Sequence, residues 1–143
     1  MKTLVAVLIG ATLLILSALH VYWAAGGKSP GASVIPEVSG RRVFEPTRVT
    51  TLAVALALAC AAVVVLARGG LLSLPIPAAP VAWACGAVGA AFLLRAMGEF
   101  RLVGFFKSVK GTEFAAMDTW FYSPLCLAIG AGALWLAFVG ARR

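Results

Sequence analysis

Four long stretches without a single Lys, Arg, Asp or Glu constrain this chain more than any other feature. They run through residues 3–25, 49–67, 69–94 and 119–141. Because an α-helix rises about 1.5 Å per residue, about 20 residues cross the roughly 30 Å hydrocarbon core of a bilayer. Backbone that faces lipid must satisfy its own hydrogen bonds, and these Leu- and Ala-rich runs lack the alternation of a barrel strand. The sequence therefore predicts four membrane-spanning helices.

The composition also favours a membrane protein. The 143 residues are 62% hydrophobic and only 12% charged, whereas a soluble domain carries about 25% charged residues. The net charge of +7 fits basic loops that lie beside lipid headgroups, so it does not indicate a nucleic-acid partner. Membrane lipids are the first partners that we expect.

Proline and glycine clusters divide the chain into two helical hairpins. Each hairpin has a long polar loop, and the short proline-rich segment 71–80 joins the two. We therefore expect a single domain over 1–143 with an all-α fold, an integral membrane four-helix bundle made of two transmembrane hairpins. The expected helices cover about 4–24, 48–67, 79–99 and 120–141.

The last helix is expected to begin at "DTWFYSP". Asp118, Thr119 or Ser123 would cap it, and Pro124 would lie in its first turn. Its expected end is at Arg142–Arg143.

The distribution of Lys and Arg predicts the orientation. Seven lie in the two long loops and four at the opposite end, which favours cytoplasmic long loops with both termini outside. The seven are Lys28, Arg41, Arg42, Arg48, Arg101, Lys107 and Lys110.

Arg95 is the most informative charged residue, since it lies about one turn inside the polar boundary of the third helix. Glu99 follows at i+4, which would place both side chains on one helix face. A charge at a helix centre costs about 2.5–3.5 kcal/mol, and less near the end, where the side chain can reach the interface. Two interpretations are open: an Arg–Glu pair within the helix, or an Arg that binds an anionic or carbonyl group of a ligand.

His20, the only histidine, lies within an apolar segment. It has no second ligand at helical spacing, so we expect no metal and no cofactor. Two roles are open for His20: an interfacial side chain that hydrogen-bonds to a neighbour, or a general acid or base partnered by Glu99 or Asp118.

Aromatic residues flank the expected membrane interface. Tyr22, Trp23, Trp120 and Tyr122 are typical of an aromatic belt. The segment "GFF" with the Lys107 and Lys110 that follow it resembles an amphipathic surface anchor. The cysteines Cys60, Cys85 and Cys126 are isolated and typical of packing residues.

Four segments together resemble a known family. "LHVYWAAGG", "RRVFEP", "LLRAMGEFRLVGFFK" and "DTWFYSPLC", in this order, are similar to small bacterial four-helix membrane proteins catalogued as domain of unknown function 3995. The resemblance covers nearly the whole chain and implies a bacterial inner-membrane location. It implies no activity.

Three function classes remain. The first is an enzyme that performs acid–base chemistry (isomerisation, cyclisation or epoxide opening) on a hydrophobic, lipid-soluble small molecule. The second is a lipid-binding or accessory membrane protein. The third is an oligomeric transporter subunit, a homo-oligomer whose helices approach through the glycines of "IGAGALW". For the enzyme, the predicted catalytic residues are His20, Glu99 and Asp118, and the predicted substrate-binding residues are Arg95, Tyr22, Trp23 and Tyr122.

Overall fold

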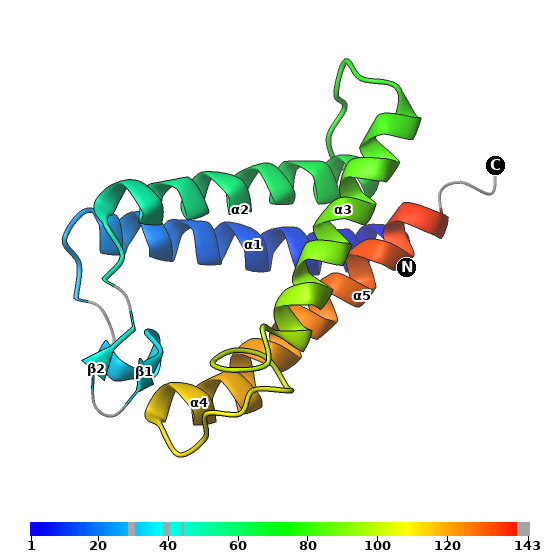
Figure 1. Ribbon diagram of the computed structural model, residues 1–143. Helices are drawn as coiled ribbons and strands as arrows, with labels where there is room; N and C mark the ends of the chain where they lie inside the picture. The colour runs from blue at the N-terminus through cyan, green and yellow to red at the C-terminus, as the bar shows by residue number, and fades with distance from the viewer. Residues whose placement is uncertain (29–30, 39–40, 44, 140–143) are drawn as a thin grey trace.

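The computed structural model describes residues 1–28, 31–38, 41–43 and 45–139, and it is predominantly helical (Figure 1). Four helical segments are long and apolar enough to cross a membrane, which confirms the predicted all-α four-helix membrane fold. The first three are α1 (Lys2–Ala24), α2 (Arg48–Arg68) and α3 (Ala78–Met97). The fourth is continuous through α4 (Glu113–Met117), the π-turn η2 (Asp118–Tyr122) and α5 (Ser123–Val139).

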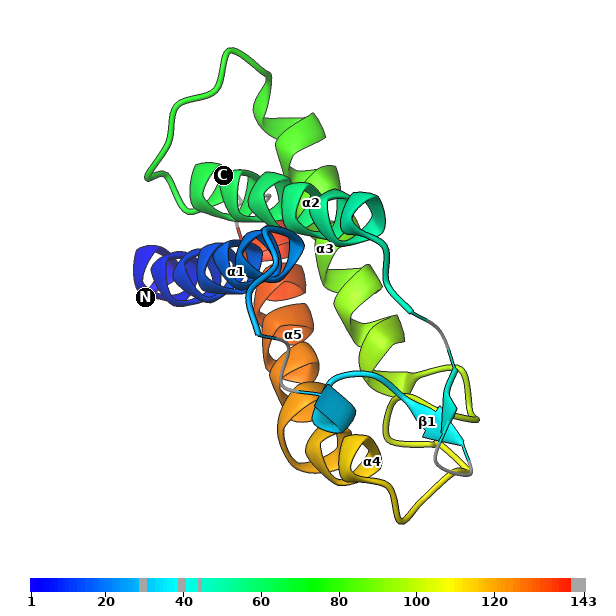
Figure 2. The ribbon, with the colours of Figure 1, turned by 90° about the vertical axis from the view of Figure 1, so that its left-hand side faces the viewer.

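The four segments form two antiparallel hairpins, α1–α2 and α3–α5. Both views show that the hairpins cross near the chain termini and diverge toward the two long loops (Figures 1 and 2). The first long loop extends across to the second hairpin, where η1 contacts α4. This loop contains η1 (Gly31–Ser33) and a two-stranded antiparallel ribbon of β1 (Glu37–Val38) and β2 (Arg41–Arg42).

The core lies where the hairpins cross. Apolar surface gains little from helix association within lipid, so close backbone approach and hydrogen bonds must hold such helices together. Ser17 of α1 provides one such bond, because its Oγ donates to the Ala55 carbonyl oxygen of α2 at 2.7 Å. The core residues are small or aliphatic: Ala6, Ile9, Leu13, Ala62, Val65, Cys85, Ile129, Ala133, Leu136 and Ala137.

Glycines allow the helices to approach closely. A Cβ on Gly89 of α3 would lie 2.9 Å from the carbonyl oxygen of Gly130 of α5. A Cβ on Gly132 would meet the side chain of Ile9 of α1 at 2.6 Å. The glycines of "IGAGALW" therefore pack within one chain.

Two helix boundaries differ from the sequence prediction. α3 ends at Met97 rather than near residue 99, because Gly98 leaves the helix with φ +83°. The last span begins at Glu113, where the Thr112 side chain caps it by accepting from the Ala115 N–H at 3.0 Å. The predicted cap at Asp118, Thr119 or Ser123 was therefore wrong, and the predicted end at Arg142–Arg143 lies outside the described residues.

Pro124 explains the π-turn in this last span. Proline has no backbone N–H, so it cannot donate to the carbonyl four residues earlier, and the helix loses one bond of its regular ladder. The turn widens so that the Ser123 N–H donates to the Asp118 carbonyl, five residues back. Such π-turns are rare and often occur at functional sites.

The substitution Gly89→Ala tests the close packing of α3 on α5. We expect it to lower the free energy of unfolding by roughly 1–3 kcal/mol, because the added methyl group overpacks a backbone contact. Gly86→Ala on the same helix is the control, since its Cβ would make an ordinary contact with Ala137 at 3.8 Å. Unfolding of the two variants in detergent micelles measures the difference, and equal stability would contradict this packing.

Candidate functional site

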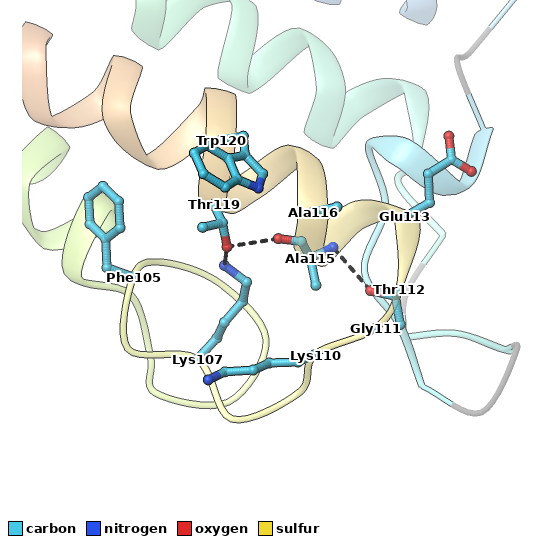
Figure 3. A pocket seen from close by; sticks show the side chains of 10 residues that line it. All are labelled: Phe105, Lys107, Lys110, Gly111, Thr112, Glu113, Ala115, Ala116, Thr119 and Trp120. Carbon is cyan, nitrogen blue, oxygen red and sulfur yellow. Dashed lines mark hydrogen bonds between the residues drawn. The ribbon is translucent and has the colours of Figure 1, made fainter.

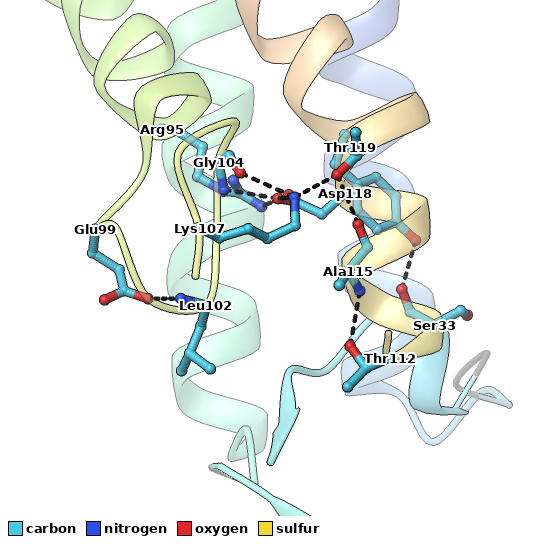
Figure 4. Close-up of polar contacts among 11 residues, drawn as sticks. Ser33, Arg95, Glu99, Leu102, Gly104, Lys107, Thr112, Ala115, Asp118 and Thr119 are labelled. Carbon is cyan, nitrogen blue, oxygen red and sulfur yellow. Dashed lines mark hydrogen bonds and ion pairs between the residues drawn. The ribbon is translucent and has the colours of Figure 1, made fainter. Parts of the chain in front are cut away.

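A buried carboxylate organises the polar end of the α3–α5 hairpin (Figure 4). Asp118 is fully buried. Its Oδ1 accepts from Arg95 Nη2 at 2.8 Å, and its Oδ2 accepts from the Gly104 N–H at 2.7 Å and from Lys107 Nζ at 3.1 Å. These groups come from α3, the following loop and η2. We call Arg95, Gly104, Lys107, Asp118 and Thr119 the Asp118 cluster.

Two glycines shape the loop that delivers these groups. Gly98 and Gly104 have φ values of +83° and +86°, a region that L side chains rarely adopt. A Cβ on Gly98 would collide with the Val103 carbonyl, and one on Gly104 would collide with the Met97 carbonyl. The segment "GEFRLVG" is therefore a tight loop whose two ends touch. It returns the chain to the end of α3 and directs the Gly104 amide toward Asp118.

Lys107 is the least expected member of the cluster. It is only 4% exposed, and its Nζ donates to the Gly104 carbonyl at 3.0 Å, to Asp118, and to Thr119 Oγ1 at 2.6 Å. Thr119 Oγ1 in turn donates to the Ala115 carbonyl at 3.0 Å. An ammonium group has three donors, and here each has an acceptor. The interpretation of Lys107 as a surface anchor was therefore wrong.

The cluster carries an excess of positive charge. Arg95 and Lys107 are two cations around the single carboxylate of Asp118, which leaves one net positive charge. Within the described residues, the buried Nη1 atom of Arg95 has no hydrogen-bond partner. Burying ions is costly unless each is paired and hydrogen-bonded, so an anion close to this cluster would be stabilised.

The predicted helical pair of Arg95 and Glu99 was wrong. Since α3 ends at Met97, Glu99 lies in the loop and not on a face of the helix. Its carboxylate accepts from the backbone N–H of Leu102 instead (Figure 4). Arg95 pairs with Asp118, which is 23 residues away in the sequence.

His20, Tyr22 and Trp23 lie on the other hairpin, near the end of α1. His20 Nδ1 donates to the Leu16 carbonyl oxygen at 2.7 Å, and its ring meets that of Trp23 edge to face at 5.1 Å. The Tyr22 hydroxyl accepts from the Lys28 N–H at 3.3 Å. Among the described residues, His20 has no hydrogen bond to an acidic side chain, so it hydrogen-bonds to a neighbour, and the alternative pairing with Glu99 or Asp118 does not form.

Tyr122 links the two hairpins at the polar end. Its hydroxyl donates to the Ser33 carbonyl oxygen at 3.2 Å, across the gap between the first loop and the last span. Its ring packs against Phe114 and Phe121, with centroids 6.2 and 5.7 Å away. Of the predicted site residues, the structure thus brings together Arg95 and Asp118, with Tyr122 one turn further on.

Sequence reasoning missed Gly104, Lys107 and Thr119 as partners of Asp118. One usable signal was the pair of glycines six residues apart directly after a helix, which is typical of a tight loop. The second usable signal was Lys107, a cation that lies between Phe106 and the start of the last span. Neither signal names Asp118 as the shared partner, because that contact is long-range.

The fold and the charge placement define a small integral membrane protein with one polar end. The chain belongs to the family described as "Protein of unknown function (DUF3995)", whose model matches residues 13–133. Comparisons with curated proteins and with solved structures gave no match. The match includes the whole Asp118 cluster, and the description names no activity.

Asp118→Asn tests the cluster as a determinant of stability. The variant leaves Arg95 and Lys107 without a counter-charge, and breaking one partner of a buried pair costs about 3–5 kcal/mol. We expect a loss of that order in the free energy of unfolding. Glu99→Gln removes one carboxylate from the exposed loop but keeps an acceptor for Leu102, so it should change stability little. Equal losses in the two variants would contradict the account.

Gly104→Ala tests the loop geometry. Gly111 is the matched control, because it has the same φ of +86° but open space around its Cβ position. Both variants carry the backbone strain, about 1 kcal/mol, and only Gly104→Ala adds a collision with backbone. We expect a clearly larger drop in melting temperature for Gly104→Ala than for Gly111→Ala. If Gly104→Ala lowers the melting temperature less than Gly111→Ala does, the closed loop is refuted.

Proposed function

We propose that this protein is a lipid-binding membrane protein that holds the anionic headgroup of a membrane amphiphile at its polar end. The observation that carries the proposal is the excess positive charge beside an interfacial pocket. In this proposal the protein resides in a bacterial inner membrane, and the ligand is a lipid or another hydrophobic molecule with an anionic head.

The pocket lies between the second long loop and the start of the last span (Figure 3). Its volume of about 590 Å³ is within the range of about 300–1,000 Å³ of ligand sites. Phe105 and Trp120 supply aromatic surface, and Lys107 and Lys110 supply positive charge. Trp120 is 84% exposed, as suits an aromatic ring at the level of lipid headgroups.

The charges around the pocket favour an anion. The charged residues that line it are Lys107, Lys110 and Glu113, which leaves one net positive charge, and the adjoining pair of Arg95 with Asp118 adds none. The donors of Lys107 are already used, so it contributes charge, whereas the exposed Lys110 can donate hydrogen bonds directly. A headgroup phosphate or carboxylate fits this arrangement.

The geometry favours binding over acid–base catalysis by the predicted residues. Both oxygens of Asp118 are occupied and buried, so a substrate would have to displace a cation to reach them. His20 lies on the other hairpin, where it donates a hydrogen bond to the Leu16 carbonyl oxygen. The Glu99 carboxylate accepts a hydrogen bond from the Leu102 N–H. A general acid and base need to lie within hydrogen-bond reach of the same reacting group.

The orientation follows from the same proposal. Long loops on the cytoplasmic side would place the pocket at the leaflet surface where anionic lipids attract Lys and Arg, worth about 1 kcal/mol per residue. Oligomeric transport has less support, because the glycines expected to join subunits contact α1 and α3 of their own chain.

Lys110→Gln combined with Trp120→Ala tests the pocket. Both side chains are exposed, so folding should be unaffected. We expect roughly fivefold weaker retention of phosphatidylglycerol, and no change for phosphatidylcholine, in native mass spectrometry of the reconstituted protein. Arg101→Gln removes one exposed charge from the same loop outside the pocket and serves as the control. If Arg101→Gln reduces retention equally, the pocket is not the site.

A further inference from the structure

A second hollow lies at the other end of the molecule, between α3 and α5. This groove has a volume of about 640 Å³. It follows α3 from Ala78 to Ala90, a length of about 18 Å at a rise of about 1.5 Å per residue. This length is close to the thickness of the hydrocarbon layer of one leaflet, roughly 15 Å. Alanines, Gly86 and Trp83 of α3 line the groove, together with Leu134, Ala137 and Phe138 of α5. The lining that matters is Ala82, Gly86, Ala87, Ala90, Leu134 and Phe138.

A buried arginine lies at the mouth of this groove. Arg68, the last residue of α2, is 8% exposed. Its Nη2 donates to the Ala137 carbonyl oxygen at 2.9 Å, but its buried Nε has no hydrogen-bond partner in the described part of the chain. A smaller hollow of about 220 Å³, bordered by Ser73, adjoins the groove. Arg68 and Ala78 line both the groove and this hollow.

Among the described residues, no acidic side chain forms an ion pair with Arg68. The five acidic residues all lie in the long loops or at the polar end of the last span, at positions 37, 45, 99, 113 and 118. Both ion pairs among the described residues involve Asp118, at the opposite end from Arg68. A buried cation that no described carboxylate neutralises, at the end of a membrane span, would be stabilised by an anion.

We propose that this groove binds one anionic phospholipid of the leaflet opposite the Asp118 cluster. An acyl chain lies along the alanine and glycine floor of α3. The phosphate occupies the adjoining hollow at Ser73, beside the guanidinium of Arg68. This site is independent of the function proposed above, since it shares no residue with the pocket at Lys110.

A second copy of the chain is the competing occupant, because small residues also admit a neighbouring helix. An apolar helix would leave the charge of Arg68 without a counter-ion. A phosphate supplies a negative charge, so the electrostatics favour the lipid.

The experiment is native mass spectrometry of the full chain released from bilayers of equal parts phosphatidylglycerol and phosphatidylcholine. Wild type should retain phosphatidylglycerol at this site. Arg68→Gln should weaken retention roughly ten- to hundredfold, as expected for a lost charge-assisted hydrogen bond. Because Arg68→Gln also disturbs the bond to Ala137, a second variant is needed. Ala87→Phe fills the groove from an exposed position and should also remove this lipid.

Leu94→Phe is the control, since it adds the same ring to an exposed position of α3 outside the groove. The lipid at Lys110 should persist in Arg68→Gln and in Ala87→Phe, which separates the two sites. Retention that Ala87→Phe and Leu94→Phe affect equally would overturn the proposal. A dimer that Ala87→Phe dissociates would also overturn it, in favour of a second copy.

Discussion

The structure depends on one buried carboxylate that two cations share. Exposing the charged carboxylate of Asp118 to lipid would cost much free energy. The carboxylate is instead buried, and it accepts hydrogen bonds from Arg95, Lys107 and the Gly104 amide. These donors come from α3 and from the loop after it, so the charge fixes the end of one hairpin helix to the start of the other. The glycine-closed loop and the π-turn at Pro124 are the backbone features that allow this convergence.

The distribution of charge along the molecule connects fold and function. All acidic side chains lie toward the long loops, whereas cations are present at both ends. At the polar end the surplus lies beside the pocket at Lys110, and at the other end Arg68 is a buried cation. We propose one anion site at each end, with the apolar helix surfaces between the two sites facing hydrocarbon.

The sequence predicted the fold well and the site only in part. Uncharged runs report membrane spans directly, because hydrocarbon excludes charge over a fixed length. Arg95 and Asp118 could be selected as functional candidates because each is a charge at a span boundary. The pairing of Arg95 with Asp118 rather than Glu99 could not be predicted. The i+4 spacing pairs Arg95 with Glu99 only if the helix continues to residue 99, but Gly98 ends it at Met97. The burial of Lys107 likewise depends on a loop closure that local pattern does not encode.

An experimental structure of the protein in lipid nanodiscs that contain phosphatidylglycerol tests the central claim most directly. We expect Arg95 and Lys107 both on the Asp118 carboxylate, with headgroup density beside Lys110 and Trp120. An Asp118 carboxylate that faces an open cavity, with Lys107 turned toward solvent, would contradict the account and return the cluster to consideration as an acid–base site.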